Sequence, residues 1–589
     1  MKPFVIRHCR AAARRSAATP TPFICGGAAP FIRRAAALVI ALAALAASAS
    51  PPEMVVRLES LRAFDETLWA LREQTADRAA AEETMLAQAK LFAGLGIDYM
   101  RPDEPILAAF WNLSWPVDLG KLDFLAVLPV RRGSVAPRVR IHLMDEEAQT
   151  VGGLTIRPVG PPESDGGAHR RPWIAFDGAQ TVVASDPALL AALPGLRAAQ
   201  PAIPGAPVSV LVPSLERLLR SGGRVVEKDD DGSDPLLGPR TYFLPPEQAT
   251  SNELGGTFSI MAAGMRGREA GSLAFGLSAT PADGILFAAV ARPADPANSL
   301  YATNPPPPLA AADLAVVPAD ALVWSASTDG SGRCAGVVSA DSIYLGFNDT
   351  PANHARKAAF DAFFAALDAA SAERGRVVRF LAPAEGGALR WESRVGTRRP
   401  DAERKLAAAY AALCRTESEI AGTNTPAFFR TDRTDWAADG LSGRVRIPGG
   451  TAASYNFDAL VAGLFGDDVP WRLDVGADAA ALSIGRGPAT DAPAGSAPCD
   501  LEAPRRWFPA MEPFRVSALR PAPVLARLGL ETDSADDDPV ALETFSIVDN
   551  SLVWTVSAPS AGVRALSRLV LSFLNPPTPP NLENRNGLH

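Results

Sequence analysis

The chain has 589 residues, which is more than one hydrophobic core serves and predicts two or more folded regions. Its hydrophobic content of 47% excludes a wholly disordered chain. With 65 acidic against 57 basic residues it lacks the basic surplus that nucleic-acid binding requires, so no nucleic-acid partner is expected.

Residues 1–49 have the pattern of a secretory signal peptide. They hold no Asp or Glu, carry scattered Lys and Arg, continue with the apolar run 35–47 and end on the small residues Ala47, Ser48 and Ala49. An uncleaved anchor is the alternative, although the run is short for a membrane span. We expect an exported protein of the periplasm or cell envelope, in contact with the membrane only if the leader is retained.

The region 51–308 is expected to form a first α+β lobe. Alternating apolar and polar residues predict its strands, and Asp177-Gly178 between two such runs predicts a tight hairpin. Turn residues occupy 281–284, and Pro293 and Pro296 are expected at the entry of a helix that the prolines at 305–308 stop. The expected strands are 122–130, 138–143, 173–176, 181–184, 208–212, 272–277 and 285–290, and the expected helices are 79–92, 188–193, 215–219 and a stretch from Leu61.

The region 318–580 is expected to form a second lobe with the same succession of features. A further hairpin over 376–395 is interpreted as an insertion without a counterpart in the first lobe. The expected strands are 444–447, 470–475, 481–484, 516–520 and the two runs flanking Asp549-Asn550, and the expected helices are 355–373, 401–420, 524–528 and a stretch after Pro559.

Both lobes close on Asn-Pro-Pro, at 304–306 and 575–577. Because the features before these closures recur in one order, we interpret the chain as a tandem duplication. The predicted fold is α+β, with two related lobes, each a mainly antiparallel sheet with helices packed on one face. A single large α+β chain with unrelated hairpins is the alternative. Residues 581–589 are expected to be a disordered tail.

This succession of paired hairpins and Pro-capped helices resembles large exported bacterial proteins of unknown function built from repeated hairpin–helix lobes. The resemblance extends loosely over the whole chain after the leader and lies in the layout of the elements. It implies the two-lobe layout and export, and it supplies no activity and no site.

No motif of the chain assigns a catalytic, cofactor-binding or metal-binding residue. His142 with Asp145 and Glu146 could form an acid–base pair, but strand alternation would point His142 and Asp145 to opposite faces. The acidic loop 229–234 has oxygens suited to calcium, but Arg240 stands where a calcium loop needs a bidentate Glu. We therefore expect no catalytic residue, no cofactor and no metal.

Three cysteines follow the leader: Cys334, Cys414 and Cys499. Their odd number and wide spacing exclude a disulfide-framework domain and a cysteine zinc site. One disulfide and three thiols both remain open, and three thiols is the preferred interpretation.

Trp173 and Trp471 occupy matching places in the two lobes. A ligand-stacking pair is conceivable, although packing on a sheet face is the more usual role of such residues. The helix 355–373 carries Phe360, Phe363, Phe364 and Leu367 on one side, which is expected to pack against its own sheet, with a partner or membrane-surface role as the alternative. In the expected helix 401–420, Leu406, Tyr410 and Leu413 share one face.

These observations predict an exported non-catalytic protein of the cell envelope with a binding or scaffolding role. Its partner is unknown; an envelope protein or a ligand in a cleft between the two lobes is the expectation. The alternative is an uncharacterised periplasmic hydrolase or metal-dependent enzyme. That alternative requires His142 or His169 to meet carboxylates from a distant strand.

Overall fold

The computed structural model describes a defined set of residues. They are 52–74, 101–111, 123–130, 143, 147–159, 171–177, 180–199, 201–214, 270–297, 299, 303–330, 351–384, 389–421, 434–436, 441–446, 465, 468–485, 499–527 and 540–574. The predictions for the leader, the loop 229–234, the helices 79–92 and 215–219 and the tail 581–589 lie outside the described residues.

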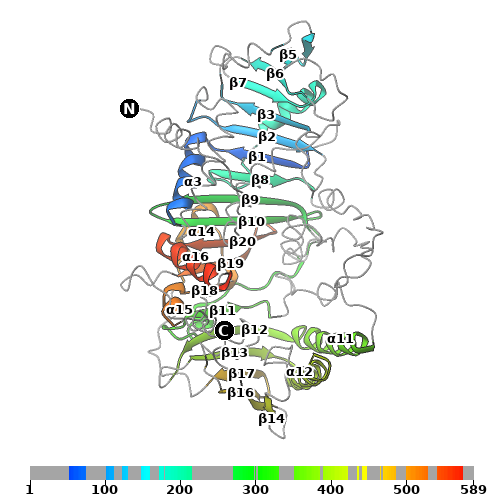
Figure 1. Ribbon diagram of the computed structural model, residues 1–589, viewed down its shortest axis with the longest axis vertical. Coiled ribbons are helices and arrows are strands. Elements are labelled where there is room, and N and C mark those ends of the chain that lie inside the picture. Colours follow the sequence, from blue (N-terminus) through cyan, green and yellow to red (C-terminus); the bar gives the residue numbers. More distant parts are fainter. Residues whose placement is uncertain are drawn as a thin grey trace, which may run out of the picture. The chain divides into compact units, whose positions relative to one another are not determined.

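The chain divides into two compact units. Unit 1 comprises 1–224, 249–257 and 270–294, and unit 2 comprises 225–248, 258–269 and 295–589. Strands β1 to β10 belong to unit 1 and β11 to β20 belong to unit 2 (Figure 1). Each unit is therefore described by its own sheet and helices.

Unit 1 contains a mainly hairpin-connected antiparallel sheet. Its neighbouring strands run in the order β4-β5-β6-β7-β3-β2-β1-β8-β9-β10. The strands are β1 (Met54–Leu58), β2 (Ile106–Trp111), β3 (Asp123–Leu128), β4 (Gln149–Val151), β5 (Leu154–Pro158), β6 (Trp173–Asp177), β7 (Gln180–Ala184), β8 (Val208–Val212), β9 (Ala270–Thr280) and β10 (Gly284–Pro293), and the helices are α3 (Leu61–Gln74), η5 (Pro187–Ala192) and α6 (Leu193–Ala198).

The core of unit 1 lies where η5 and α6 cover the central strands. Leu125, Val127 and Ile156 are fully buried there, as strand alternation requires of one face. Asp186 caps η5 by accepting a hydrogen bond from the backbone N–H of Ala188 at 2.8 Å. The predicted short helix after Pro187 is confirmed, with its first turns in the 3₁₀ form.

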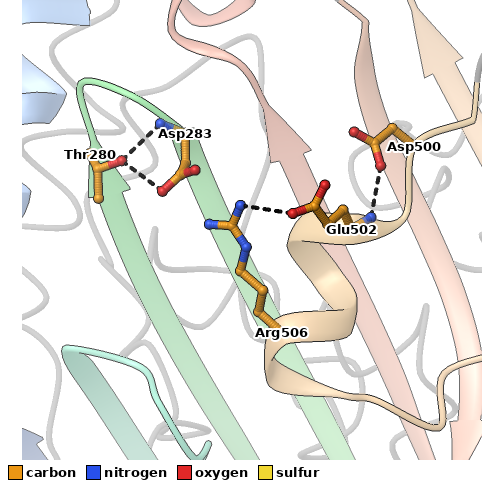
Figure 2. Close-up of polar contacts among 5 residues, drawn as sticks. All are labelled: Thr280, Asp283, Asp500, Glu502 and Arg506. Atoms are coloured by element: carbon orange, nitrogen blue, oxygen red, sulfur yellow. Dashed lines mark hydrogen bonds and ion pairs between the residues drawn. The ribbon is translucent and has the colours of Figure 1, made fainter.

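The β9–β10 hairpin confirms the predicted strand–turn–strand over 272–290. The Thr280 hydroxyl accepts a hydrogen bond from the Asp283 backbone N–H at 2.9 Å, and Gly284 takes a φ of +82° (Figure 2). Residues 294–297 then form a bend and a turn. Further on, Thr303 is helical, and its backbone N–H donates a hydrogen bond to the carbonyl of Ser299 at 3.0 Å. Residues 298 and 300–302 lie outside the described residues, so the Pro-led helix expected here stays a prediction.

Unit 2 also contains an antiparallel sheet, with the order β14-β15-β16-β17-β13-β12-β11-β18-β19-β20. Its strands are β11 (Val323–Ser327), β12 (Arg374–Pro383), β13 (Leu389–Thr397), β14 (Thr434–Trp436), β15 (Ser442–Arg446), β16 (Asp468–Val475), β17 (Ala479–Gly485), β18 (Pro513–Leu519), β19 (Ala541–Val548) and β20 (Ser551–Ala558). Its helices are α10 (Ala311–Leu314), α11 (Pro351–Ser371), α12 (Pro400–Ala421), α14 (Glu502–Trp507), α15 (Pro521–Arg527) and α16 (Ser560–Leu574).

The two sheets have the same strand order when β1 is matched with β11, β2 with β12, and so on. The hairpin over 376–395 is β12–β13, which holds the place of β2–β3 in unit 1. The interpretation of that hairpin as an insertion is therefore wrong. The expected strand 444–447 is β15, which has the place of β5 in unit 1. The short β4–β5 hairpin at Gly152-Gly153 was not predicted from the sequence, and residues 138–142 of the expected strand 138–143 lie outside the described residues.

The helices of unit 2 confirm several predictions. The expected helices 355–373 and 401–420 are α11 and α12, and the Pro-led helices are α15 and α16. At α14, Asp500 accepts a hydrogen bond from the Glu502 backbone N–H at 2.8 Å, and Arg506 reaches Glu502 at 3.5 Å (Figure 2). The broad α+β prediction with antiparallel pairing is confirmed. Within the described residues, no helix combines the length and apolarity of a membrane span.

Candidate functional site

A cavity of about 300 Å³ lies inside unit 2, between the sheet and the helix pair α11–α12. Its floor is formed by β13, β15, β16 and β17, and its roof by one face of α12 with Phe363 of α11. Helix α12 packs against α11 and against β16 and β17 (Figure 1). Ligand pockets in proteins span roughly 300–1,000 Å³, so the cavity is large enough for a small molecule.

The floor is apolar because of strand register. Side chains directly opposite each other in an antiparallel pair lie on the same face of a sheet. Leu482 stands opposite Ser393 on one side and Leu473 on the other, and Ile484 stands opposite Trp471 in the next row. All five of these side chains line the cavity.

The roof follows from helical spacing. Glu403, Leu406, Ala407 and Tyr410 lie three and four residues apart on α12 and all line the cavity. The ring of Tyr410 also contacts Phe363 of α11, with the ring centroids 6.1 Å apart. The shared face predicted for Leu406 and Tyr410 is the face that covers the cavity.

The polar end of the cavity is an ion pair between Arg374 and Glu403. Arg374 is the first residue of β12, shortly after α11 ends, and Glu403 lies in the first turn of α12. Nε and Nη2 of Arg374 donate to the two carboxylate oxygens of Glu403, each at 2.8 Å. The side chains are only 12% and 5% exposed, so the pair ties the start of β12 to the start of α12.

Ser393 is the other polar group of the floor. It is 7% exposed and lines the cavity. Within the described residues its hydroxyl makes no hydrogen bond with the protein. Because the residue lines the cavity and its hydroxyl is not engaged by the described protein groups, the hydroxyl is available to a ligand that carries a polar atom.

Tyr410 contributes its ring rather than an ionisable group. Burial raises the pKa of its hydroxyl, and the neighbouring Cys414 raises that pKa further. The hydroxyl therefore stays protonated throughout the physiological range. Cys414 is buried and Cys499 half-buried, and both are free thiols, while Cys334 lies outside the described residues.

The candidates named from the sequence have different outcomes. His142, His169 and the loop 229–234 lie outside the described residues, so the enzyme alternative stays a prediction. Trp471 lines the cavity, while Trp173 lies on β6 beside Arg171, with the guanidinium 5.7 Å from the ring centre. Among the residues that the structure describes, no three His, Cys, Asp or Glu residues gather as a metal site would require.

The sequence patterns do not by themselves predict a pocket at this place. Two of them correspond to its walls: the apolar face of helix 401–420 forms the roof, and the alternation around Trp471 forms part of the floor. The signal that was missing is the pairing of β13 with β17, because these strands are far apart in the sequence. That pairing brings Ser393 into the apolar floor.

Comparison with known proteins adds no further guide to this site. No protein-family model matches the chain, and no curated protein or solved structure matches it. The assignment of a function therefore depends on the geometry and chemistry of the cavity.

Proposed function

We propose that the chain is an exported, non-catalytic binding protein of the cell envelope whose unit 2 cavity takes a small, mostly apolar molecule. The observation that carries the proposal is the cavity, with apolar walls and a few polar groups at defined points. Such a combination is typical of small-molecule sites. The basic, apolar and small-residue order of the leader supports export.

The polar groups of the cavity favour binding over catalysis. Glu403 is engaged by Arg374 through both carboxylate oxygens, so it is poorly placed to exchange a proton with a ligand. Tyr410 holds its proton because burial raises its pKa. Among the residues that the structure describes, Ser393 has no hydrogen bond to a base that would activate it as a nucleophile.

A pair of neighbouring alanines on α12 provides the test. Ala407 lines the cavity and Ala408 is exposed on the other side of the helix. N-phenyl-1-naphthylamine, a neutral probe that fluoresces in apolar surroundings, is titrated into the full chain. Ala407→Trp should weaken binding at least about tenfold by filling the cavity, whereas Ala408→Trp should leave it unchanged.

A second cavity-filling variant keeps the test valid if the Ala407→Trp protein does not fold. Ala480 lines the floor from β17, so Ala480→Leu fills the same space from the opposite side. Melting temperatures identify variants that remain folded. If folded Ala407→Trp and Ala480→Leu proteins bind the probe as the unchanged chain does, the cavity is not the site.

We also propose that units 1 and 2 are copies of one ancestral module. The identical strand orders support duplication, because two unrelated sheets of this size would rarely share one connection order. An experimentally determined structure tests this: the Cα atoms of β1–β10 should superpose on those of β11–β20 in sequence order. A superposition that requires strands to be exchanged would contradict it.

Export has its own test. The intact mass of the mature protein recovered from the cell envelope should correspond to a chain that begins after Ala49. A mass that includes residues 1–49 would indicate a retained anchor instead.

A further inference from the structure

Arg379 occupies a distinctive place on the sheet face that carries the cavity floor. On β12 it stands directly opposite Ser393 of β13, and on its other side opposite Ser325 of β11. Directly opposed side chains share a face, with Cβ atoms about 4.5–5.5 Å apart. Arg379 therefore lies beside the cavity, one strand away from the hydroxyl in its floor.

The side chain of Arg379 has no partner among the described residues. It makes no hydrogen bond and no ion pair with them, and the residue remains exposed. Desolvation nevertheless lowers its pKa, and the charges of Arg374 and Arg515 lower it further. Solvent thus reaches the residue while protein atoms and two other arginines surround it.

The neighbouring arginines differ from Arg379 because each has a carboxylate. Arg374 is held by Glu403 at 2.8 Å, and Arg515 lies 3.9 Å from Glu543. Each of these pairs is neutral overall. Among the described residues the cluster therefore retains one uncompensated positive charge, which belongs to Arg379, and a monoanion would complement it.

Hydroxyl groups extend on the same face beyond Arg379. Ser325 stands opposite Ser517 of β18, so the row runs Ser393, Arg379, Ser325, Ser517 across four neighbouring strands. In the described part of the chain, none of these serine side chains hydrogen-bonds to the protein. The row supplies donors for an acidic group at the side of an apolar cavity.

We infer that the ligand of the cavity is an amphiphile with a monoanionic head, a medium- or long-chain carboxylate, whose head is bound by Arg379 and Ser393 and whose chain lies over Leu482 and Leu473. This inference rests on the proposed binding function and names its ligand class. From Arg379 on β12 to Leu473 on β16 the row crosses three strand spacings, roughly 14 Å in all, which suits an extended alkyl chain. A guanidinium binds the planar carboxylate through two parallel hydrogen bonds.

The test compares three ligands that share one chain and differ in the head. Decanoate, decanol and decyl phosphate are titrated into the full chain by calorimetry. Decanoate should bind at least about tenfold more tightly than decanol, because the hydrogen bonds to Arg379 are charge-assisted. Decyl phosphate should bind no more tightly than decanoate, because only one positive charge is uncompensated.

Two arginine variants locate the head. Arg379→Gln should weaken decanoate binding at least about tenfold and leave decanol binding unchanged. Arg472→Gln is the matched control, because Arg472 is exposed, is paired with Asp474 at 2.6 Å and lies next to Trp471, on the opposite face of β16. It should change neither affinity. Melting temperatures confirm that both variants are folded.

The possible outcomes distinguish a failure of the carboxylate assignment from a failure of the proposed binding function. If decanoate and decanol bind equally and Arg379→Gln changes neither affinity, the assignment of a carboxylate head is wrong. The assignment of the apolar cavity as the binding site is then retained. If decyl phosphate binds far more tightly than decanoate, the assignment of a carboxylate is overturned. If none of the three ligands binds, both the inference and the proposed function fall.

Discussion

Arg374 and Glu403 form two hydrogen bonds of 2.8 Å to each other while both side chains are nearly buried. They join the first residue of β12 to the first turn of α12, and they close one end of the cavity. The geometry matters for stability because neither charge is free to return to water. Removing one partner leaves the other as a buried charge without compensation.

The first prediction concerns this pair. Glu403→Gln should lower the free energy of unfolding by about 3 kcal/mol or more, because Arg374 loses its counter-charge in a buried site. Asp361→Asn is the control, because it removes an exposed partner of Lys357 on α11 and should cost less than about 1 kcal/mol. Urea denaturation measures both. Equal effects would show that the Arg374 pair is solvated.

A second prediction separates stability from binding at Ser393. Its hydroxyl has no hydrogen-bond partner in the described part of the chain, so Ser393→Ala should leave the melting temperature unchanged or raise it. Decanoate affinity should fall by about tenfold or more, because the lost hydrogen bond has an ionised acceptor. Calorimetry and thermal denaturation on the same samples measure both. A destabilised variant with intact affinity would assign the hydroxyl a structural role instead.

A third prediction concerns Gly485, which ends β17 with a φ of +105°. A Cβ at this position would fall on the carbonyl oxygen of Leu389, on the paired strand β13. Gly485→Ala should therefore destabilise unit 2 by about 1–3 kcal/mol. Gly476→Ala is the control, because its Cβ would make only an ordinary 3.4 Å contact with Ala479. A neutral Gly485→Ala variant would contradict the β13–β17 register.

A fourth prediction follows the ionisation of Cys499. Burial raises the pKa of its thiol to about 11, and the neighbouring Asp500 acts in the same direction. Because the thiolate is the reactive form, the folded protein at pH 8 should be alkylated by iodoacetamide on the order of a hundredfold more slowly than an ordinary cysteine. The rate should climb as the pH approaches 11. Mass spectrometry measures it, with the urea-unfolded chain as the control; half-maximal reactivity near pH 9 in the folded protein would contradict the burial.

Local chemistry made much of the fold predictable. Asp177-Gly178 and 281–284 specify their turns through residue type, so the hairpins β6–β7 and β9–β10 could be predicted. The helix 401–420 was predictable because its apolar residues recur at helical spacing. The strand pairings β13–β17 and β11–β18 were not, because register between distant segments leaves no local mark.

The candidate site was likewise predictable in its local elements and not in its long-range strand pairing. Leu406 and Tyr410 were expected to share a face, yet the sequence did not indicate that this face covers a cavity. No sequence pattern marks Ser393 or Arg379 as part of a site, and both lie in the hairpin 376–395 that was interpreted as an insertion. Their importance arises from the register that sets them opposite each other at the edge of the floor.

The most direct test of the central claim is a crystal structure of the protein with 10-bromodecanoic acid, in which the bromine marks the end of the chain by anomalous scattering. The account predicts one bromine peak inside the cavity, near Leu473 and Trp471, with the carboxylate at Arg379. A bromine peak elsewhere, or a cavity that stays empty at saturating ligand, would contradict it.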